Sequence, residues 1–226
     1  MLDLKVWAVN LDCAGGDLSL LSTSERARID RLKRPRDRGR SLQAHCAVRR
    51  ILALQLQVDP RCLEFDVTGT GKPFLVRPAQ NLEFNLSHSG RYGLIAVATD
   101  RSVGVDIEVE RPISDLRELA HRITTGREAK LLGQLPTNRV HSTFFNLWTR
   151  KEAVLKALGR GFLIDPREID VGIGPGRSYV NFDGRIWTVE SLVIGSSVRA
   201  AAAIEGEIDT PLVLNSFEEP TATDRS

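Results

Sequence analysis

Three carboxylates alternate with aliphatic side chains in the segment GVDIEVE, residues 104–110. Successive side chains of a strand point to opposite faces, so a strand here would gather the acids on one face and bury the aliphatic residues in the core. Crowded carboxylates repel one another unless a cation neutralises them, and Mg²⁺ takes one or two carboxylates together with water and phosphate oxygens. Asp106 and Glu108 are therefore candidate magnesium ligands, and Glu110 is expected at the surface. The alternative is a plain strand with a polar outer face.

A second candidate is the helical segment WTRKEAVLKALGRGF, residues 148–162. Glu152 and Lys156 are four residues apart and share one face of a helix. By itself this spacing also fits a simple helix salt bridge worth about 0.3–0.5 kcal/mol. Trp148 and Leu155 have the spacing of core residues.

Two hydroxyls and an imidazole stand at the end of another expected strand, FNLSHSG, residues 84–90. Such groups at a strand end commonly bind phosphate or adenine, which makes Ser87 and His88 candidate ligands. Neighbouring residues of a strand point to opposite faces, so a Ser87–His88 catalytic dyad is not favoured. The G-x-S-x-G elbow of a hydrolase is missing, and a structural histidine is the alternative.

The loop GKP, residues 71–73, holds Lys72 between a glycine and a proline. This lysine could meet a phosphate or belong to an ordinary turn. The sequence has neither a P-loop motif nor a G-x-G-x-x-G after a strand, so neither nucleotide-binding fold is indicated.

Basic residues are concentrated between residues 25 and 40, although the formal net charge is only +2. The cluster favours an anionic partner such as nucleic acid, a phosphorylated cofactor or an acidic protein. The alternative is a solvated helix face. Its basic members are Arg26, Arg28, Arg31, Lys33, Arg34, Arg36, Arg38 and Arg40.

The composition is that of a globular protein, with 42% apolar and 27% charged residues. No apolar run approaches the roughly 20 residues that span a bilayer, and the N-terminus lacks the pattern of a signal peptide. Three scattered cysteines argue against disulfides and against a zinc site, and suit the cytoplasm.

Helices followed by strands are predicted in each half of the chain. Helices are expected in LSTSERARIDRL until Pro35 interrupts, from Leu42 to Leu56, and from Thr143 to Leu158, where Gly159 and Gly161 end the last one. The expected strands are MLDLKVWAVN, LEFDV, NLEFNLS, YGLIAVATD, SVGVDIEVE, Glu168–Ile173, Tyr179–Phe182, Ile186–Ile194 and Val198–Ile204. The fold class is therefore α+β, with an N-terminal lobe at 1–103, a C-terminal lobe at 104–213 and a mobile tail at 214–226.

The order of the motifs is more specific than any one of them. GKP, FNLSHSG, GVDIE and WTRKEAVLKALGRG, in this order and spacing, resemble the 4′-phosphopantetheinyl transferases, in particular the surfactin-synthetase-activating type with two lobes in one chain. The resemblance runs from about Ser24 to Phe162. It implies two similar α+β lobes related by pseudo-two-fold symmetry, the first binding coenzyme A and the second carrying the metal and catalytic residues.

The activity implied by the resemblance is Mg²⁺-dependent transfer of the 4′-phosphopantetheine arm of coenzyme A to a serine hydroxyl of an apo acyl or peptidyl carrier protein. Adenosine 3′,5′-bisphosphate is released. Such carriers serve fatty acid, polyketide and nonribosomal peptide biosynthesis. Mn²⁺ could replace Mg²⁺ because hard oxygen ligands suit both. We expect a cytoplasmic monomer without nucleic-acid or membrane partners.

Site roles also follow from the resemblance. The implied metal ligands are Asp106, Glu108 and Glu152, and the implied catalytic residues are Glu152 as base, Lys156 at the leaving group, and His88. The implied coenzyme A contacts are Ser87 and His88 at the phosphates, Lys72 at the adenine end, Arg40 at the 3′-phosphate, Arg28 at a phosphate, Asp106 and Lys156.

Three other readings remain open: a metal-dependent phosphohydrolase of coenzyme A or nucleotides, a nucleic-acid-binding protein that uses residues 26–40, and a protein that binds coenzyme A without catalysis. The chain also departs from the family pattern in RITTGREAKLL. Thr124 and Thr125 stand where the resemblance implies aromatic residues before Glu128, so the role of Glu128 is open.

Overall fold

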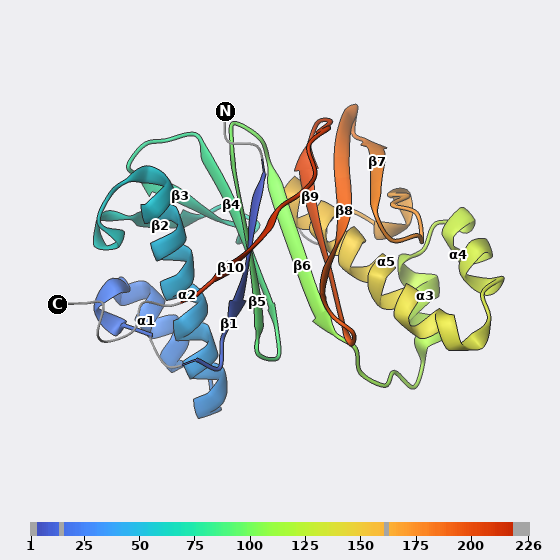
Figure 1. The fold of residues 1–226 in the computed structure, drawn as a ribbon, viewed down its shortest axis with the longest axis horizontal. Helices are drawn as coiled ribbons and strands as arrows, with labels where there is room; N and C mark the ends of the chain where they lie inside the picture. The colour runs from blue at the N-terminus through green and yellow to red at the C-terminus, as the bar shows by residue number, and fades with distance from the viewer. Residues whose placement is uncertain (1–3, 14–15, 161–162, 219–226) are drawn as a thin grey trace.

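The computed structural model describes residues 4–13, 16–160 and 163–218 (Figure 1). In these ranges the helices are α1 (Thr23–Asp30), α2 (Pro35–Leu56), α3 (Leu116–Ile123), α4 (Gly126–Gly133) and α5 (Thr137–Leu158). The strands are β1 (Lys5–Asn10), β2 (Glu64–Val67), β3 (Pro73–Arg77), β4 (Leu82–Ser89), β5 (Tyr92–Thr99), β6 (Val103–Val109), β7 (Arg177–Phe182), β8 (Arg185–Gly195), β9 (Val198–Glu205) and β10 (Leu214–Phe217).

Two four-stranded sheets form the centre of the molecule, with helices on either side of them (Figure 1). The first has the strand order β10-β1-β5-β4 and the second β6-β9-β8-β7, while β2 and β3 form a separate pair. The pairs within the two sheets are antiparallel except for β1 with β10. Each sheet is therefore built mostly from one half of the chain, and β10 is the exception.

Apolar contacts arrange these elements in four layers: helix, sheet, sheet, helix (Figure 1). Helix α2 packs on the outer face of the first sheet, with Ile51 and Ile95 in one buried cluster. The inner faces of the two sheets meet around Leu94 and Val105. Helix α5 covers the outer face of the second sheet. Strands β5, β6 and β9 are thus largely buried, and polar side chains on them need partners.

Local sequence signals explain the helix boundaries. Ser22 caps α1 through a capping box with Glu25. Pro35, which we expected to interrupt a helix, is the first residue of α2, where the missing N–H has no intrahelical partner to lose. Gly159 ends α5 in the left-handed conformation with φ 65°, and Gly161 lies outside the described residues.

Two expectations were wrong. Residues 214–217, expected to begin a mobile tail, form β10 and pair in parallel with β1; the strand has only four residues and little alternation, so the sequence carries a weak signal. The remainder of that tail from residue 219 lies outside the described residues. Residues 169–173 form no strand. Ile169 and Val171 are instead buried under α5 in an irregular segment.

The α+β class is confirmed. The pseudo-two-fold relation of the lobes and their boundary near residue 103 stay predictions. No helix in the described part of the chain is long and apolar enough to cross a membrane.

Candidate active site

Strand β4 at the edge of the first sheet is joined side by side to strand β6 at the edge of the second through side chains. The three β4 residues involved are two positions apart, so they share one face. Asn85 Oδ1 accepts from the Val105 N–H at 2.9 Å, Ser87 Oγ donates to Asp106 Oδ1 at 2.9 Å, and Ser89 Oγ donates to Glu108 Oε2 at 2.8 Å. This seam confirms that Ser87 and His88 point to opposite faces, since Ser87 is buried and His88 is exposed.

Gly104 allows helix α5 to lie directly on β6. A Cβ atom there would stand 2.1 Å from Ala153 O and 2.4 Å from Ala157 N, which are backbone atoms of α5. The close contact brings the α5 residues Glu152 and Lys156 to the polar face of β6, where the family resemblance implied that they would lie.

Asp106 and Lys156 form the centre of the site. Lys156 Nζ lies 2.6 Å from Asp106 Oδ1 and 3.0 Å from Ser87 Oγ. Asp106 is 5% exposed, and its Oδ2 atom is buried without a hydrogen-bond partner among the described residues. Burial raises the pKa of Asp106, and the neighbouring Lys156 charge offsets part of that rise. Lys156 thus forms its salt bridge with Asp106 on β6, and not with Glu152 on its own helix.

Glu152 lines a cavity of about 400 Å³ beside this pair. Burial raises the pKa of Glu152, and the negative charge of Asp106 raises it further. The same cavity is lined by apolar side chains, including Trp148, Leu155 and Ile123. A carboxylate with a raised pKa on an apolar wall is suited to accept a proton.

The carboxylates fit a hard cation unequally. The Oδ2 atom of Asp106 is a buried oxygen without a hydrogen-bond partner among the described residues, and Glu152 lies close enough for its pKa to respond to the Asp106 charge. Carboxylate oxygens are the ligands that such a cation takes. The Glu108 carboxylate is already held by Ser89 and lies 3.3 Å from Arg111 Nη1. In the described residues no three His, Cys, Asp or Glu side chains converge closely enough to hold a metal ion. Asp106 and Glu152 thus fit the expected metal better than Glu108 does.

A second cavity, of about 210 Å³, lies on the α2 side of the first sheet. Arg28 and His45 line it together with the rings of Phe65 and Phe84. Pro73 lines both this cavity and the one beside Glu152, so the two adjoin at that residue.

His88 has three basic residues in its electrostatic neighbourhood. Loss of solvent around the ring lowers the pKa of His88, and the charges of Lys156, His45 and Arg40 lower it further. Lys156 and Arg40 therefore both act electrostatically on His88.

Two expected coenzyme A contacts are engaged by protein groups. Arg40 donates from Nε and Nη2 to the Asp12 carboxylate at 2.6 and 2.9 Å. Lys72 Nζ lies 3.2 Å from Val103 O and 3.3 Å from Ala157 O. Asp12 was missed from the sequence because nothing in its spacing connects it with Arg40, 28 residues later in the chain. The alternate residues of NLSHS could have pointed to the seam, since Asn85, Ser87 and Ser89 form a polar face.

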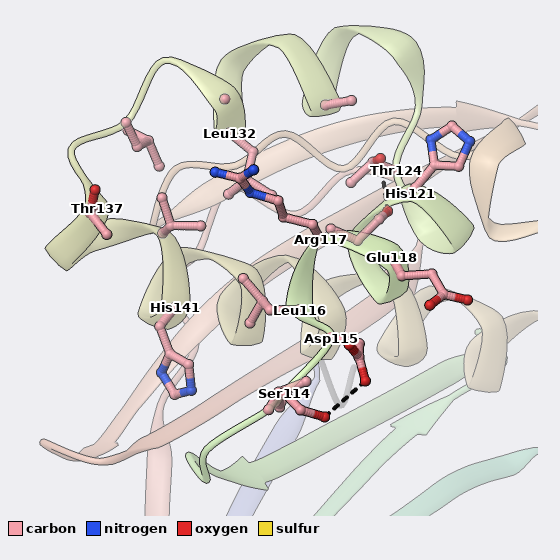
Figure 2. A pocket seen from close by; sticks show the side chains of 16 residues that line it. Ser114, Asp115, Leu116, Arg117, Glu118, His121, Thr124, Leu132, Thr137 and His141 are labelled. Atoms are coloured by element: carbon pink, nitrogen blue, oxygen red, sulfur yellow. Dashed lines mark hydrogen bonds between the residues drawn. The ribbon is translucent and has the colours of Figure 1, made fainter.

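A further cavity, of about 1100 Å³, lies between α3, α4 and the start of α5 (Figure 2). Its polar groups do not form one cluster. Ser114 donates to Asp115 at 2.9 Å, and the rings of His121 and His141 lie on opposite sides of the view in Figure 2. We assign no chemistry to it.

Comparisons with known proteins agree with the motif order. A family model described as "4′-phosphopantetheinyl transferase superfamily" matches residues 102–202, and one described as "4′-phosphopantetheinyl transferase, N-terminal" matches residues 7–100. The 4′-phosphopantetheinyl transferase HetI of Nostoc sp. is 37% identical over 210 residues, which cover 90% of this chain and 88% of that protein. The chain belongs to the 4′-phosphopantetheinyl transferase superfamily.

Two further relatives match over shorter stretches. A putative 4′-phosphopantetheinyl transferase of Synechocystis sp. is 41% identical over 147 residues, or 65% of this chain and 60% of the relative. The 4′-phosphopantetheinyl transferase Sfp of Bacillus subtilis is 31% identical over 144 residues, or 64% and 62%. This phosphopantetheinyl transferase is therefore an enzyme that uses coenzyme A and transfers phosphopantetheine to carrier proteins. The comparisons do not favour the phosphohydrolase or the nucleic-acid-binding reading.

Proposed function

We propose that this transferase moves the phosphopantetheine arm to a serine hydroxyl of an apo acyl or peptidyl carrier protein and releases adenosine 3′,5′-bisphosphate. The observation that carries the proposal is the cluster of Ser87, Asp106 and Lys156 at the β4–β6 seam, with Glu152 beside it on a cavity wall. An ammonium, a buried carboxylate and a proton acceptor at one place are what a phosphoryl transfer needs.

The two adjoining cavities suggest how coenzyme A lies. The cavity with Phe65, Phe84 and Arg28 offers ring contacts and a cation to the adenosine end. Next to it, Lys156 offers positive charge to the phosphates, and His88, whose lowered pKa favours the neutral ring, offers a hydrogen bond from its N–H group. The apolar cavity at Trp148 and Leu155 would take the uncharged arm or the carrier segment around the serine.

In the proposed step the serine oxygen attacks the phosphorus that carries the arm, and the bond from this phosphorus to the oxygen of adenosine bisphosphate breaks. Glu152 takes the serine proton, for which its raised pKa is favourable. Lys156 stabilises the charge on the leaving phosphate or gives it a proton.

Asp106, Glu152 and, with its present partners displaced, Glu108 would hold a Mg²⁺ or Mn²⁺ ion. When bound, this ion would neutralise charge on the pyrophosphate of coenzyme A. Arg40 and Arg28 are the proposed contacts to the outer phosphates. Arg40 must then share its guanidinium with Asp12 or release it.

The test is intact-protein mass spectrometry of an apo carrier incubated with coenzyme A, Mg²⁺ and the enzyme. We expect a mass gain of one phosphopantetheine arm, lost with EDTA and with Glu152→Gln, and retained with Glu110→Gln. Glu110 is a matched control because it follows β6 but forms an ion pair with Arg199. Adenosine bisphosphate released without any carrier would support a phosphohydrolase, and no gain with several carriers would overturn the proposal.

The proposal also covers the cellular compartment and the oligomeric state of the enzyme. We expect a monomer in the cytoplasm. The described cysteines Cys13, Cys46 and Cys62 are all free thiols, which suits a reducing compartment.

A further inference from the structure

Lys72 lies where three elements of the active site meet. Its Nζ atom is 3.2 Å from Val103 O at the start of β6, 3.3 Å from Ala157 O in α5 and 3.6 Å from Glu83 Oε2 on β4. Its side chain is only 13% exposed, and burial lowers the pKa of Lys72 while Glu83 raises it in part. An ammonium has three N–H donors. Two of them are used by the carbonyl groups of Val103 and Ala157, and Glu83 lies within ion-pair distance.

The carbonyl of Ala157 needs such a partner. The last carbonyls of a helix have no intrahelical donor and form the negative end of the helix dipole. The Gly159 N–H donates to Leu155 O and Lys156 O, and Lys72 Nζ donates to Ala157 O. Thr70 adds a hydrogen bond from Oγ1 to Gly159 O. Residues from the N-terminal half thus cap the C-terminus of a helix that belongs to the other half.

The three elements that Lys72 joins also hold the reacting groups. Strand β4 carries Ser87 and His88, β6 carries Asp106, and α5 carries Glu152 and Lys156. Lys156 immediately precedes Ala157, so a shift of this last turn would move its ammonium away from Asp106. A ligand that drew the Lys72 ammonium away would leave the buried carbonyl groups of Val103 and Ala157 without this partner, which is unfavourable.

We propose that Lys72 is a positioning residue: together with Thr70 it fixes the C-terminal turn of α5 against β4 and β6, and so sets Glu152 and Lys156 relative to Asp106. This proposal rests on the proposed function for the roles of those residues. It replaces the expectation that the Lys72 ammonium contacts the adenine end of coenzyme A.

The test compares Lys72→Met, Thr70→Val and the control Lys130→Met, which removes an exposed lysine from α4. Hydrogen exchange of amides in the last two turns of α5 should become at least about threefold faster in Lys72→Met, with no change in α2. Because misplacement of reacting groups lowers the rate itself, kcat should fall about tenfold or more while the KM for coenzyme A stays within about twofold. Thr70→Val, which keeps the ammonium, should show both effects in smaller measure, and Lys130→Met neither.

A raised KM with unchanged kcat would make Lys72 a coenzyme A contact and overturn the proposal. Unchanged exchange in α5 would overturn it too, as would a lower melting temperature with wild-type kcat, which would leave Lys72 a purely structural role. Should Lys72→Met fail to fold, Thr70→Val alone decides by the same readouts. If the wild-type protein modified no carrier, the proposed function would fail, while the exchange measurement would still report on the cap.

Discussion

Lys156 and Asp106 form a 2.6 Å ion pair that joins helix α5 to strand β6. The ammonium contacts only Oδ1, and Oδ2 stays buried with no hydrogen-bond partner in the described chain. A carboxylate buried this deeply is costly unless it is compensated. A cation bound at Oδ2 during the reaction, in addition to the Lys156 ammonium at Oδ1, would compensate the buried carboxylate.

Asp106→Asn should abolish most of the activity without unfolding the protein. Loss of the carboxylate removes both the Lys156 partner and the proposed metal ligand, so we expect carrier modification to slow at least about a hundredfold. Stability should change by less than about 1 kcal/mol, because burial of the charge is relieved and the partly exposed Lys156 can reach water. Initial rates and urea unfolding measure the two effects. Glu110→Gln is the control, and wild-type rates in Asp106→Asn would contradict the site assignment.

Gly104→Ala should disturb the contact between β6 and α5. The new methyl group would collide with backbone atoms of α5 at 2.1 and 2.4 Å, and backbone cannot move aside as a side chain can. We expect a loss of about 3 kcal/mol or more of unfolding free energy, or an insoluble protein. The matched control is Gly133→Ala in α4, where no heavy atom lies within 4 Å of the added carbon. That variant should be neutral or stabilised by up to about 1 kcal/mol.

Glu128→Gln should destabilise the protein strongly. Glu128 and Lys151 form a 2.7 Å ion pair with side chains 0% and 2% exposed, so the substitution would leave a buried ammonium uncompensated. The expected loss is about 3–5 kcal/mol in denaturant unfolding.

Two further variants test the cause. Glu128→Gln with Lys151→Met should recover part of the loss, since both charges are then gone. Glu118→Gln, which breaks an exposed pair with Arg122, should cost less than about 0.5 kcal/mol. Equal effects of Glu118→Gln and Glu128→Gln would show that burial is not the reason.

Glu25→Gln should change how stability depends on pH. Burial alone raises the pKa of Glu25, but the contact with His45 and the hydrogen bonds from Arg49 and Ser22 outweigh it and hold the pKa well below its usual range. An acid with a lowered folded-state pKa contributes stability above its unfolded value of 4.5, and the contribution is lost as the pH falls through the folded value.

The wild type should therefore be more stable than Glu25→Gln by about 2 kcal/mol at neutral pH, with the gap narrowing as the pH falls from about 5 to about 3. Urea unfolding at a series of pH values measures this gap. A gap that is constant over this range would show that the charge of Glu25 does not act through its lowered pKa.

Much of the secondary structure could be predicted because its signals are local. The alternation in residues 103–109 identified β6, and Gly159 marked the end of α5. The expected strand at 186–194 and that at 198–204 are β8 and β9 to within one residue at each end. Strand β10 could not be predicted, since its stability comes from pairing with β1, about two hundred residues earlier.

The candidate site was predictable in its residue types but not in its contacts. Motif order brought Asp106, Glu152 and Lys156 into one hypothesis. Lys156 forms its ion pair with Asp106, and Ser89 donates a hydrogen bond to Glu108. Both contacts depend on how the two sheets pack together, and the spacing of residues along the chain does not encode this packing. Glu128, whose role the sequence left open, caps α4 with Thr125 and pairs with Lys151.

The return of the chain through β10 has a mechanical consequence. The chain crosses between the sheets twice, at residues 100–102 and at residues 206–213, and Arg101 binds these crossings together through Glu205 O at 2.6 Å and Glu207 O at 3.0 Å. Both covalent links therefore meet at one corner, at the Val103 end of β6. Any rocking of one sheet against the other must pivot there, with the smallest excursion at Val103 and the largest some 20 Å away at Val109. Asp106 lies midway along this strand, and Glu108 lies near its far end, where the hydrogen bond from Ser89 joins the two sheets.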